Sequence, residues 1–290
     1  MEYKIFDAHC DTLCLLNDNN ASIAKNSFNI DRERMGKYKA YTQIFACFID
    51  PVYKNCAMER FIELSDAFYS QNINGILSIE GGEMITSLKA LRTLKRLGVR
   101  IAALTWNYSN HIAAGVLESD KDRGFTEFGK QVIEEMNKIN MLIDISHLND
   151  KSFYDVAELS KMPIVATHSN SRAICNHPRN LTDEQFKAII KSGGCVGMNF
   201  YNLFLNDNGS ADVDDIIKHI EHFMSLGGED NIGMGSDFDG VDNNLPEGIK
   251  GCEDMYKVFD RLLALNYTDE QIEKISHRNF ERIFGGDRNA

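Results

Sequence analysis

Short apolar runs recur along the chain at regular intervals, and each is bounded by polar or turn-forming residues. The eight runs of this kind are residues 3–11, 41–49, 73–81, 99–106, 141–147, 163–169, 194–201 and 231–240. Their apolar residues are continuous rather than alternating. This pattern is typical of strands in a parallel sheet that is buried on both faces.

Segments with the period of an amphipathic helix lie between these runs. They are residues 58–71, 87–97, 129–139, 183–191 and 214–226. Capping boxes at Thr182 to Gln185 and at Thr268 to Gln271 mark two helix starts. Eight strands that alternate with helices predict an α/β protein with a TIM-like (β/α)8 barrel, and a doubly wound open sheet is the alternative. No segment has the composition of a linker, so we expect a single domain over residues 1–290.

The composition is that of a globular protein, with 43% hydrophobic and 26% charged residues, which excludes a disordered or fibrous chain. The 31 basic and 43 acidic side chains give a formal net charge of −12. This charge argues against binding to nucleic acid or to an anionic membrane, and favours a small or neutral partner. No run approaches the roughly 18 apolar residues of a membrane span, and the first residues lack the apolar core of a signal peptide. We therefore expect a cytoplasmic protein.

Imidazole and carboxylate side chains stand at the ends of five of the predicted strands. They are His9, Asp11, Glu80, His147, His168 and Asp237. In a β/α barrel these ends form one rim, where the loops build the active site. His9 and Asp11 are two residues apart, so on a strand both side chains point to the same face and can chelate one ion. The supply of ligands exceeds one tetrahedral zinc site, which favours two ions that share a bridging carboxylate.

The remaining histidines fit a metal site less well. His219 and His222 have helical spacing on an amphipathic segment, and His277 lies in the last predicted helix, so we expect structural roles for all three. His111 follows the fourth predicted strand by several residues. The sequence leaves open whether its side chain reaches the site or faces solvent.

The candidate ligands lie in motifs that resemble those of the membrane dipeptidase (renal dipeptidase) family of binuclear zinc peptidases, which are amidohydrolase-type barrels. The resemblance covers nearly the whole chain, and EGG after a strand and GSDFDG near the end are its most distinctive segments. The matching motifs are DAHCDT at 7–12, IEGGE at 79–83, LIDISH at 142–147, THS at 167–169, HPRN at 177–180, MNFY at 198–201 and GSDFDG at 235–240.

This resemblance implies a metal-dependent dipeptidase with two Zn²⁺ ions per chain, for which Mn²⁺ or Co²⁺ are alternatives. The implied ligands are His9 and Asp11 for the first ion, His147 and His168 for the second, and Glu80 as the bridge between both. It further implies that a hydroxide between the ions attacks the dipeptide carbonyl, with Asp237 as acid/base and Arg179 as the partner of the substrate carboxylate. A guanidinium fork suits that role because it matches a carboxylate with two hydrogen bonds.

One position departs from the family pattern. After the fourth strand the renal enzymes have Leu-Thr-His, whose histidine helps to bind the scissile carbonyl, whereas this chain has Leu-Thr-Trp at 104–106. Either the metal alone polarises the carbonyl, or a neighbour such as Asn107 or His111 supplies the donor. The tyrosine that lines the renal pocket corresponds to Phe204, with Tyr201 nearby. We expect Tyr201 and Asn107 among the substrate contacts.

Two other functions are compatible with the sequence. Deamination, lactone opening or phosphoester cleavage can occur on the same metal pair, because fold and metals do not determine which bond is cleaved. A catalytically silent barrel that serves as a binding protein is the second alternative. Such proteins usually lose metal ligands, however, and this chain keeps all six candidates. The oligomeric state is open, with a homodimer as one option.

Overall fold

Eight parallel strands close into a barrel in the computed structural model of the chain, which describes residues 1–285. The strands are β1 (Lys4–Asp7), β2 (Ala40–Phe48), β3 (Ile76–Glu80), β4 (Val99–Ala103), β5 (Leu142–Asp144), β6 (Val165–Ala166), β7 (Cys195–Met198) and β8 (Ile232–Met234). Their order around the ring follows the sequence, and Asp7 pairs with Met234 to close it. The predicted TIM-like barrel is therefore confirmed, and the open sheet is wrong.

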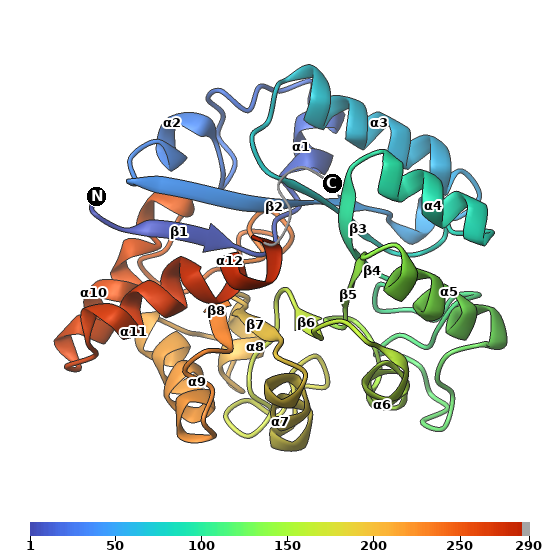
Figure 1. The fold of residues 1–290 in the computed structure, drawn as a ribbon. Coiled ribbons are helices and arrows are strands. Elements are labelled where there is room, and N and C mark those ends of the chain that lie inside the picture. Colours follow the sequence, from blue (N-terminus) through green and yellow to red (C-terminus); the bar gives the residue numbers. More distant parts are fainter. Residues whose placement is uncertain (286–290) are drawn as a thin grey trace.

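Helices surround this ring (Figure 1). They are α1 (Thr12–Asp18), α2 (Arg32–Met35), α3 (Ala57–Ser70), α4 (Leu88–Arg96), α5 (Glu127–Lys138), α6 (Asp150–Leu159), α7 (Asp183–Lys191), α8 (Asn202–Leu205), α9 (Val213–Ser225), α10 (Tyr256–Ala264), α11 (Asp269–Glu273) and α12 (Asn279–Phe284). All five predicted helical segments are helices, and both predicted capping boxes form. Short turns η1 (Pro51–Tyr53) and η2 (Cys252–Asp254) and a π-helical turn η3 (Lys274–Arg278) complete the elements.

Seven of the eight strands are shorter than the apolar runs that predict them. β1 ends at Asp7, so His9 and Asp11 follow the strand, and Asp11 is the residue that precedes α1. The prediction that these two side chains share a strand face is therefore wrong. The apolar runs continue because the rim loops are themselves buried: Ile145 and Phe238 lie beyond β5 and β8 and are 3% and 0% exposed.

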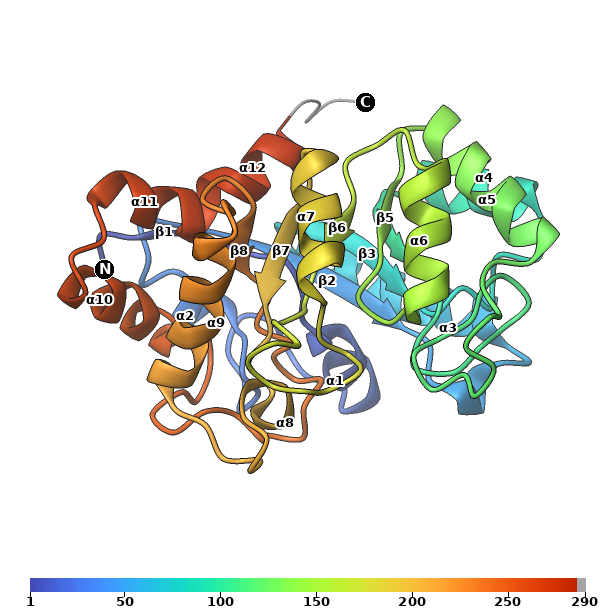
Figure 2. The same cartoon turned by 90° about the horizontal axis from the view of Figure 1, so that it is seen from below.

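The last helix fills the N-terminal end of the barrel. Phe280 and Phe284 of α12 belong to a buried cluster with side chains from the strands, and the Phe280 ring stacks on Phe6 with 5.4 Å between centroids. Gly233 in β8 makes room for this helix, since a Cβ there would lie 2.4 Å from the Phe280 ring. In Figure 2 α12 lies at the opposite end of the barrel from α1 and α8. The C-terminal rim with the candidate residues is thus far from α12.

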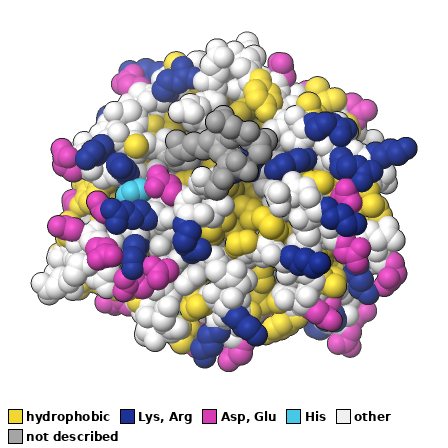
Figure 3. Space-filling view, viewed as in Figure 1, with side chains coloured by type: hydrophobic (Ala, Val, Ile, Leu, Met, Phe, Trp, Pro, Cys, Tyr) yellow, Lys and Arg dark blue, Asp and Glu magenta, His cyan; other side chains and the backbone are white. Residues whose placement is uncertain are grey.

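The surface around the N-terminal end of the barrel carries basic and acidic side chains side by side, with hydrophobic side chains near its centre (Figure 3). Within residues 1–285, no helix combines the length and apolar character that a bilayer span requires. All seven cysteines are free.

Candidate metal centre

A cavity of about 410 Å³ opens at the C-terminal rim of the barrel. Seven of the nine residues predicted for the site line it, namely Asp11, Glu80, Asn107, His147, Arg179, Tyr201 and Asp237. The other two, His9 and His168, are 2% and 1% exposed and lie against the lining residues. The barrel therefore brings all nine predicted residues to one place.

Glu80, the last residue of β3, lies between two groups of candidate ligands. Its Oε2 atom is 3.3 Å from Nε2 of His9, and that nitrogen is 3.4 Å from Oδ2 of Asp11. Its Oε1 atom is 2.5 Å from Nε2 of His147 and 3.9 Å from Nε2 of His168. The five side chains form two clusters that share Glu80, and each cluster holds three ligand atoms within 4.8 Å of one another.

Hydrogen bonds on the outer nitrogens of two histidines determine which nitrogen faces the cluster. The side-chain oxygen of Asn107 accepts from Nδ1 of His147 at 2.9 Å, and the hydroxyl oxygen of Thr167 accepts from Nδ1 of His168 at 2.8 Å. Both rings therefore carry the proton on Nδ1 and turn an Nε2 lone pair inward. The two Nε2 atoms are 2.9 Å apart. Lone pairs at this separation repel each other unless they share a cation, so the arrangement fits a metal ion.

Unpartnered atoms and crowded negative charge support the same fit. Nε2 of His9 and Oδ1 of Asp11 are buried without a hydrogen-bond partner. Burial and the Glu80 carboxylate raise the pKa of Asp11 to about 7. Burial would also raise the pKa of Glu80, but His147 and His9 hold it well below its usual range. Three imidazole nitrogens and two carboxylates are a donor set that suits zinc or a similar divalent ion.

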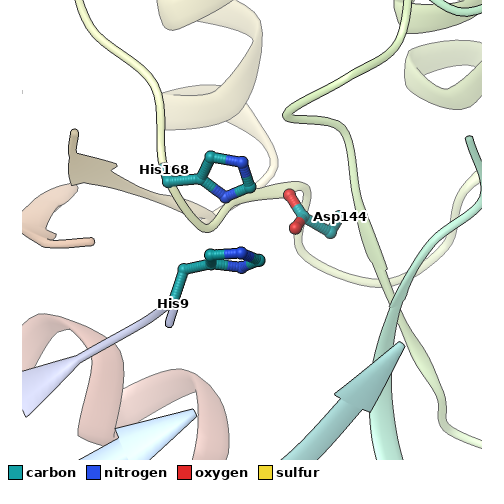
Figure 4. Close-up of side chains that lie close together, drawn as sticks. All are labelled: His9, Asp144 and His168. Carbon is teal, nitrogen blue, oxygen red and sulfur yellow. The ribbon is translucent and has the colours of Figure 1, made fainter. Parts of the chain in front are cut away.

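Asp144, the last residue of β5, lies beside His9 and His168 at the edge of the cluster (Figure 4). One of its oxygens accepts from the backbone N–H groups of Ser146 and Thr167, both at 3.0 Å, and from the Ser146 hydroxyl at 2.6 Å. The other accepts from the Thr167 hydroxyl. Because both oxygens are committed, Asp144 suits orientation of a ligand better than ligation itself. Because the Thr167 hydroxyl donates its hydrogen bond to Asp144, its oxygen accepts from Nδ1 of His168.

Asp237 projects from the loop after β8 with a φ of +62°, a conformation that costs a non-glycine residue energy and is frequent at functional sites. Its Oδ2 atom accepts from Nδ2 of Asn199 at 2.8 Å. Its Oδ1 atom is 3.8 Å from Nε2 of His9. One oxygen is therefore held by an amide, while the other faces the cluster and can exchange a proton with a bound molecule.

Arg179 lies between β6 and α7 and is 5% exposed. Its Nη2 atom is 3.0 Å from Nε2 of His147, while its Nε and Nη1 atoms are buried without a partner. Its Cζ atom is 5.4 Å from the centre of the Phe204 ring, which contacts the ring of Tyr201 at 4.8 Å. Burial lowers the pKa of Arg179 to about 10, so the group stays charged at neutral pH. A buried cation with unused donors at the cavity wall fits an anionic ligand.

The loop after β4 contains Trp106, the position at which the sequence departs from the pattern of the family that it resembles. Asn107 lines the cavity, but its oxygen is bonded to His147. His111 does not line the cavity, and its Nε2 atom bonds a backbone carbonyl oxygen at 2.9 Å. His111 is therefore not the donor that replaces the histidine of the family. Trp106 itself lines the cavity wall.

Three residues that orient others were missed by sequence reasoning: Asp144, Thr167 and Asn199. One signal was available, because Asp144 ends β5 shortly before a candidate ligand just as Asp7 ends β1. Asp7 accepts from the backbone N–H and the hydroxyl of Ser236 at 2.8 and 2.5 Å. Both carboxylates thus tie a strand end to the loop of a neighbouring strand.

The fold and this centre define a class of protein, an eight-stranded α/β barrel with buried histidines and carboxylates suited to metal ions at its C-terminal rim. The family model of membrane dipeptidase, peptidase family M19, matches residues 53–289. The chain belongs to this family, as its motifs predict.

Relatives and solved structures agree with this assignment. An uncharacterised protein from the pqqA 5′ region of Klebsiella pneumoniae is 39% identical over 202 residues, which are 67% of this chain and 74% of that protein. An uncharacterised dipeptidase of Schizosaccharomyces pombe is 35% identical over 218 residues, 72% of this chain but only 51% of its own length. The chain thus spans about half of that relative.

Two crystal structures superpose on nearly the whole chain. An M19 metallopeptidase described as dipeptidase AC has a TM-score of 0.89 at 27% identity, over 98% of this chain and 100% of its own. A metallopeptidase of Rhodobacter sphaeroides, bound to a phosphinate mimic of the dipeptide L-Ala-D-Ala, has a TM-score of 0.87 at 25% identity. The match covers 98% of this chain and 99% of that structure.

Proposed function

We propose that the chain is a dipeptidase that hydrolyses the peptide bond of a dipeptide with the help of two divalent ions, with zinc the first choice. The proposal assigns one ion to His9 and Asp11, the other to His147 and His168, and both to Glu80. When bound, such ions lower the pKa of water toward neutrality and polarise a carbonyl oxygen.

The side chains around the ions then divide the remaining tasks. Asp237 takes the proton of the attacking water on Oδ1 and delivers it to the leaving amine, while Asn199 keeps the carboxylate aimed at the cluster. Asn107 acts through His147, whose tautomer its oxygen determines. Tyr201 contributes to the wall beside Arg179 and so contacts the substrate from that side.

The position of Arg179 carries the proposal. Its unpartnered donors are adjacent to the cluster, since Nη2 is 3.0 Å from Nε2 of His147. A peptide residue spans about 3.3–3.6 Å, so a terminal carboxylate on Arg179 leaves the preceding carbonyl at the metal ions. A cavity of about 410 Å³ limits what can precede that carbonyl. The phosphinate dipeptide mimic bound by the Rhodobacter relative supports the same substrate class.

A reconstitution experiment tests this function against its rivals. Protein stripped with a chelator is reloaded with Zn²⁺, Mn²⁺ or Co²⁺ and assayed on dipeptides such as Gly-Leu, on a lactone and on a phosphotriester. We expect the reloaded protein to hydrolyse dipeptides and the stripped protein to be inactive. Turnover of the lactone or triester alone would contradict the proposal. Bound metal without any turnover would favour a binding protein.

A further inference from the structure

The cavity has different walls on the two sides of the metal centre. Because the eight strands close in sequence order, the end of β2 lies across the barrel from the loop after β6. The β6 loop carries Arg179, and Phe48 is the last residue of β2. Both side chains line the cavity, and Glu80 and His147 line it as well. A ligand held by Arg179 that passes over the cluster therefore extends toward Phe48.

Two rings form the wall on this far side. The ring of Phe48 lies 5.3 Å from the ring of Trp106, and both line the cavity together with Cys14. The Cys14 thiol donates to the carbonyl oxygen of Phe48 at 3.8 Å, so it faces the same wall. Trp106 is also the position where the family pattern has a histidine, so a polar donor is replaced here by a large apolar surface.

The polar side chains on this wall already have other partners. The other lining residues from the loops after β1 to β4 are Asp11, Glu80 and Asn107. The first two are candidate metal ligands, and the oxygen of the third is bonded to His147.

The loop after β8 adds Asp239 and Asp242 to the lining of the cavity, but the oxygens of Asp239 accept from Thr12 and Asn29, and Asp242 is exposed to solvent. A charged substrate side chain buried against the two rings would therefore lose its water without gaining a buried counter-ion, which is costly. An apolar side chain would bury its surface against two rings, which is favourable.

We infer that Phe48 and Trp106 bind the side chain of the amino-terminal residue of the dipeptide, and that the enzyme prefers a large apolar or aromatic residue there. The inference rests on the proposed function, because the direction of the substrate follows from a carboxylate on Arg179. Trp106 is then a specificity-determining residue, and its substitution changes the ranking of dipeptides by kcat/KM.

The test compares kcat/KM of the zinc-loaded enzyme for Phe-Gly, Leu-Gly, Lys-Gly and Glu-Gly. We expect the first two to exceed the last two by at least about tenfold, and Trp106→Ala to remove most of this ratio. Phe204→Leu is the matched control, because Phe204 is an aromatic wall residue beside Arg179. It should change KM for all four substrates alike and leave the ratio intact. Equal values for the four dipeptides in the wild type would overturn the inference alone, and hydrolysis of none would overturn the proposed function with it.

A binding measurement separates recognition from turnover. Trp106 is the only tryptophan of the chain, so tryptophan fluorescence reports on this wall. A non-hydrolysable phosphinate analogue of Phe-Gly should change the emission and bind at least about tenfold more tightly than the analogue of Lys-Gly. Phe48→Ala keeps the fluorophore and should lose most of this difference. Unchanged emission at saturation, or equal affinities for the two analogues, would overturn the inference.

Discussion

Glu80 is the residue on which both proposed metal positions depend, because its two oxygens face different histidines. Glu80→Gln replaces one oxygen with an amide nitrogen that cannot bind a cation, so we expect the content of both ions to fall together. His168→Ala should lower mainly the content of one ion. Elemental analysis after dialysis against limiting metal distinguishes the two patterns. A full complement of both ions in Glu80→Gln would show that this carboxylate does not bridge.

Substitution of Asp144 tests whether the orientation of His168 affects metal affinity. In Asp144→Asn an amide NH₂ can face the Thr167 hydroxyl, so the proton on Nδ1 of His168 is no longer secured. We expect one ion to bind roughly 10- to 100-fold more weakly, measured by competition with a chromophoric chelator. Asp155→Asn is the control, since Asp155 is a buried carboxylate that accepts from the backbone N–H of Phe125 outside the centre. Equal metal affinity in both variants would contradict the orienting role.

Substitution of Asp237 tests the proposed proton transfer separately from metal binding. Asp237→Asn should keep both ions and the fold but lower kcat by roughly 10²- to 10⁴-fold, because an amide cannot accept the proton. Asp239→Asn changes the same loop, but the Asp239 oxygens are committed to Thr12 and Asn29, so its effect on kcat should be small. A near-normal kcat for metal-loaded Asp237→Asn would move the acid/base role to another group.

Helix α9 is tied to the rim loops by one buried histidine. Nδ1 of His219 accepts from the backbone N–H of Ser171 at 3.0 Å, and Nε2 donates to the carbonyl oxygen of Leu205 at 3.0 Å. Burial lowers the pKa of His219 to about 4. The folded-state pKa lies below the unfolded value near 6.5, so the neutral ring stabilises the fold fully above about pH 6.5. This stabilisation, at most ~3 kcal/mol, is lost as the pH falls toward about 4.

Urea unfolding of the metal-free protein checks this linkage. His219→Gln cannot titrate, so the difference in unfolding free energy between wild type and variant should be largest near about pH 7.5 and shrink near about pH 4.5. Removal of the metal excludes a contribution from pH-dependent metal binding, and titration of the free ligands is common to both proteins and cancels in the difference. A difference that does not vary with pH would contradict the lowered pKa of His219.

The positions of the strands could be predicted from the sequence, but their ends could not. Parallel strands buried on both faces read as continuous apolar runs, which located all eight. The buried rim loops continue those runs, as at Ile145 and Phe238, so His9 was wrongly included in a strand. Residue types at the strand ends indicated the candidate ligands. The orienting contacts of Asp144 and Asn199 were hidden, because their partners lie 23 and 38 residues away along the chain.

The two ends of the barrel have different tasks. The N-terminal end is filled by α12 through Phe280 and Phe284, whereas the C-terminal rim carries the cavity and the candidate metal centre. Closure of the ring in sequence order places Arg179 and Phe48 on opposite walls of that cavity. In the proposed function, the whole fold, rather than one motif, therefore determines how a dipeptide would lie across the proposed metal positions.

The dipeptidase assignment depends most on the contact between Arg179 and a terminal carboxylate. The decisive measurement is kcat/KM of the metal-loaded enzyme for a free dipeptide and for its C-terminal amide, in the wild type and in Arg179→Met. A charge-assisted pair contributes about 1.5–3 kcal/mol, so the wild type should prefer the free dipeptide by roughly 10- to 150-fold. Arg179→Met should abolish this preference, and Arg179→Lys should restore only part of it, since lysine lacks the planar fork.

Arg172→Met is the control for this measurement, because Arg172 lies in the same loop but is paired with Asp150 at 2.8 and 2.9 Å. It should keep the preference for the free dipeptide. Equal cleavage of dipeptide and amide by the wild type, or equal weakening of both by Arg179→Met, would contradict the carboxylate clamp and with it the assignment as a dipeptidase.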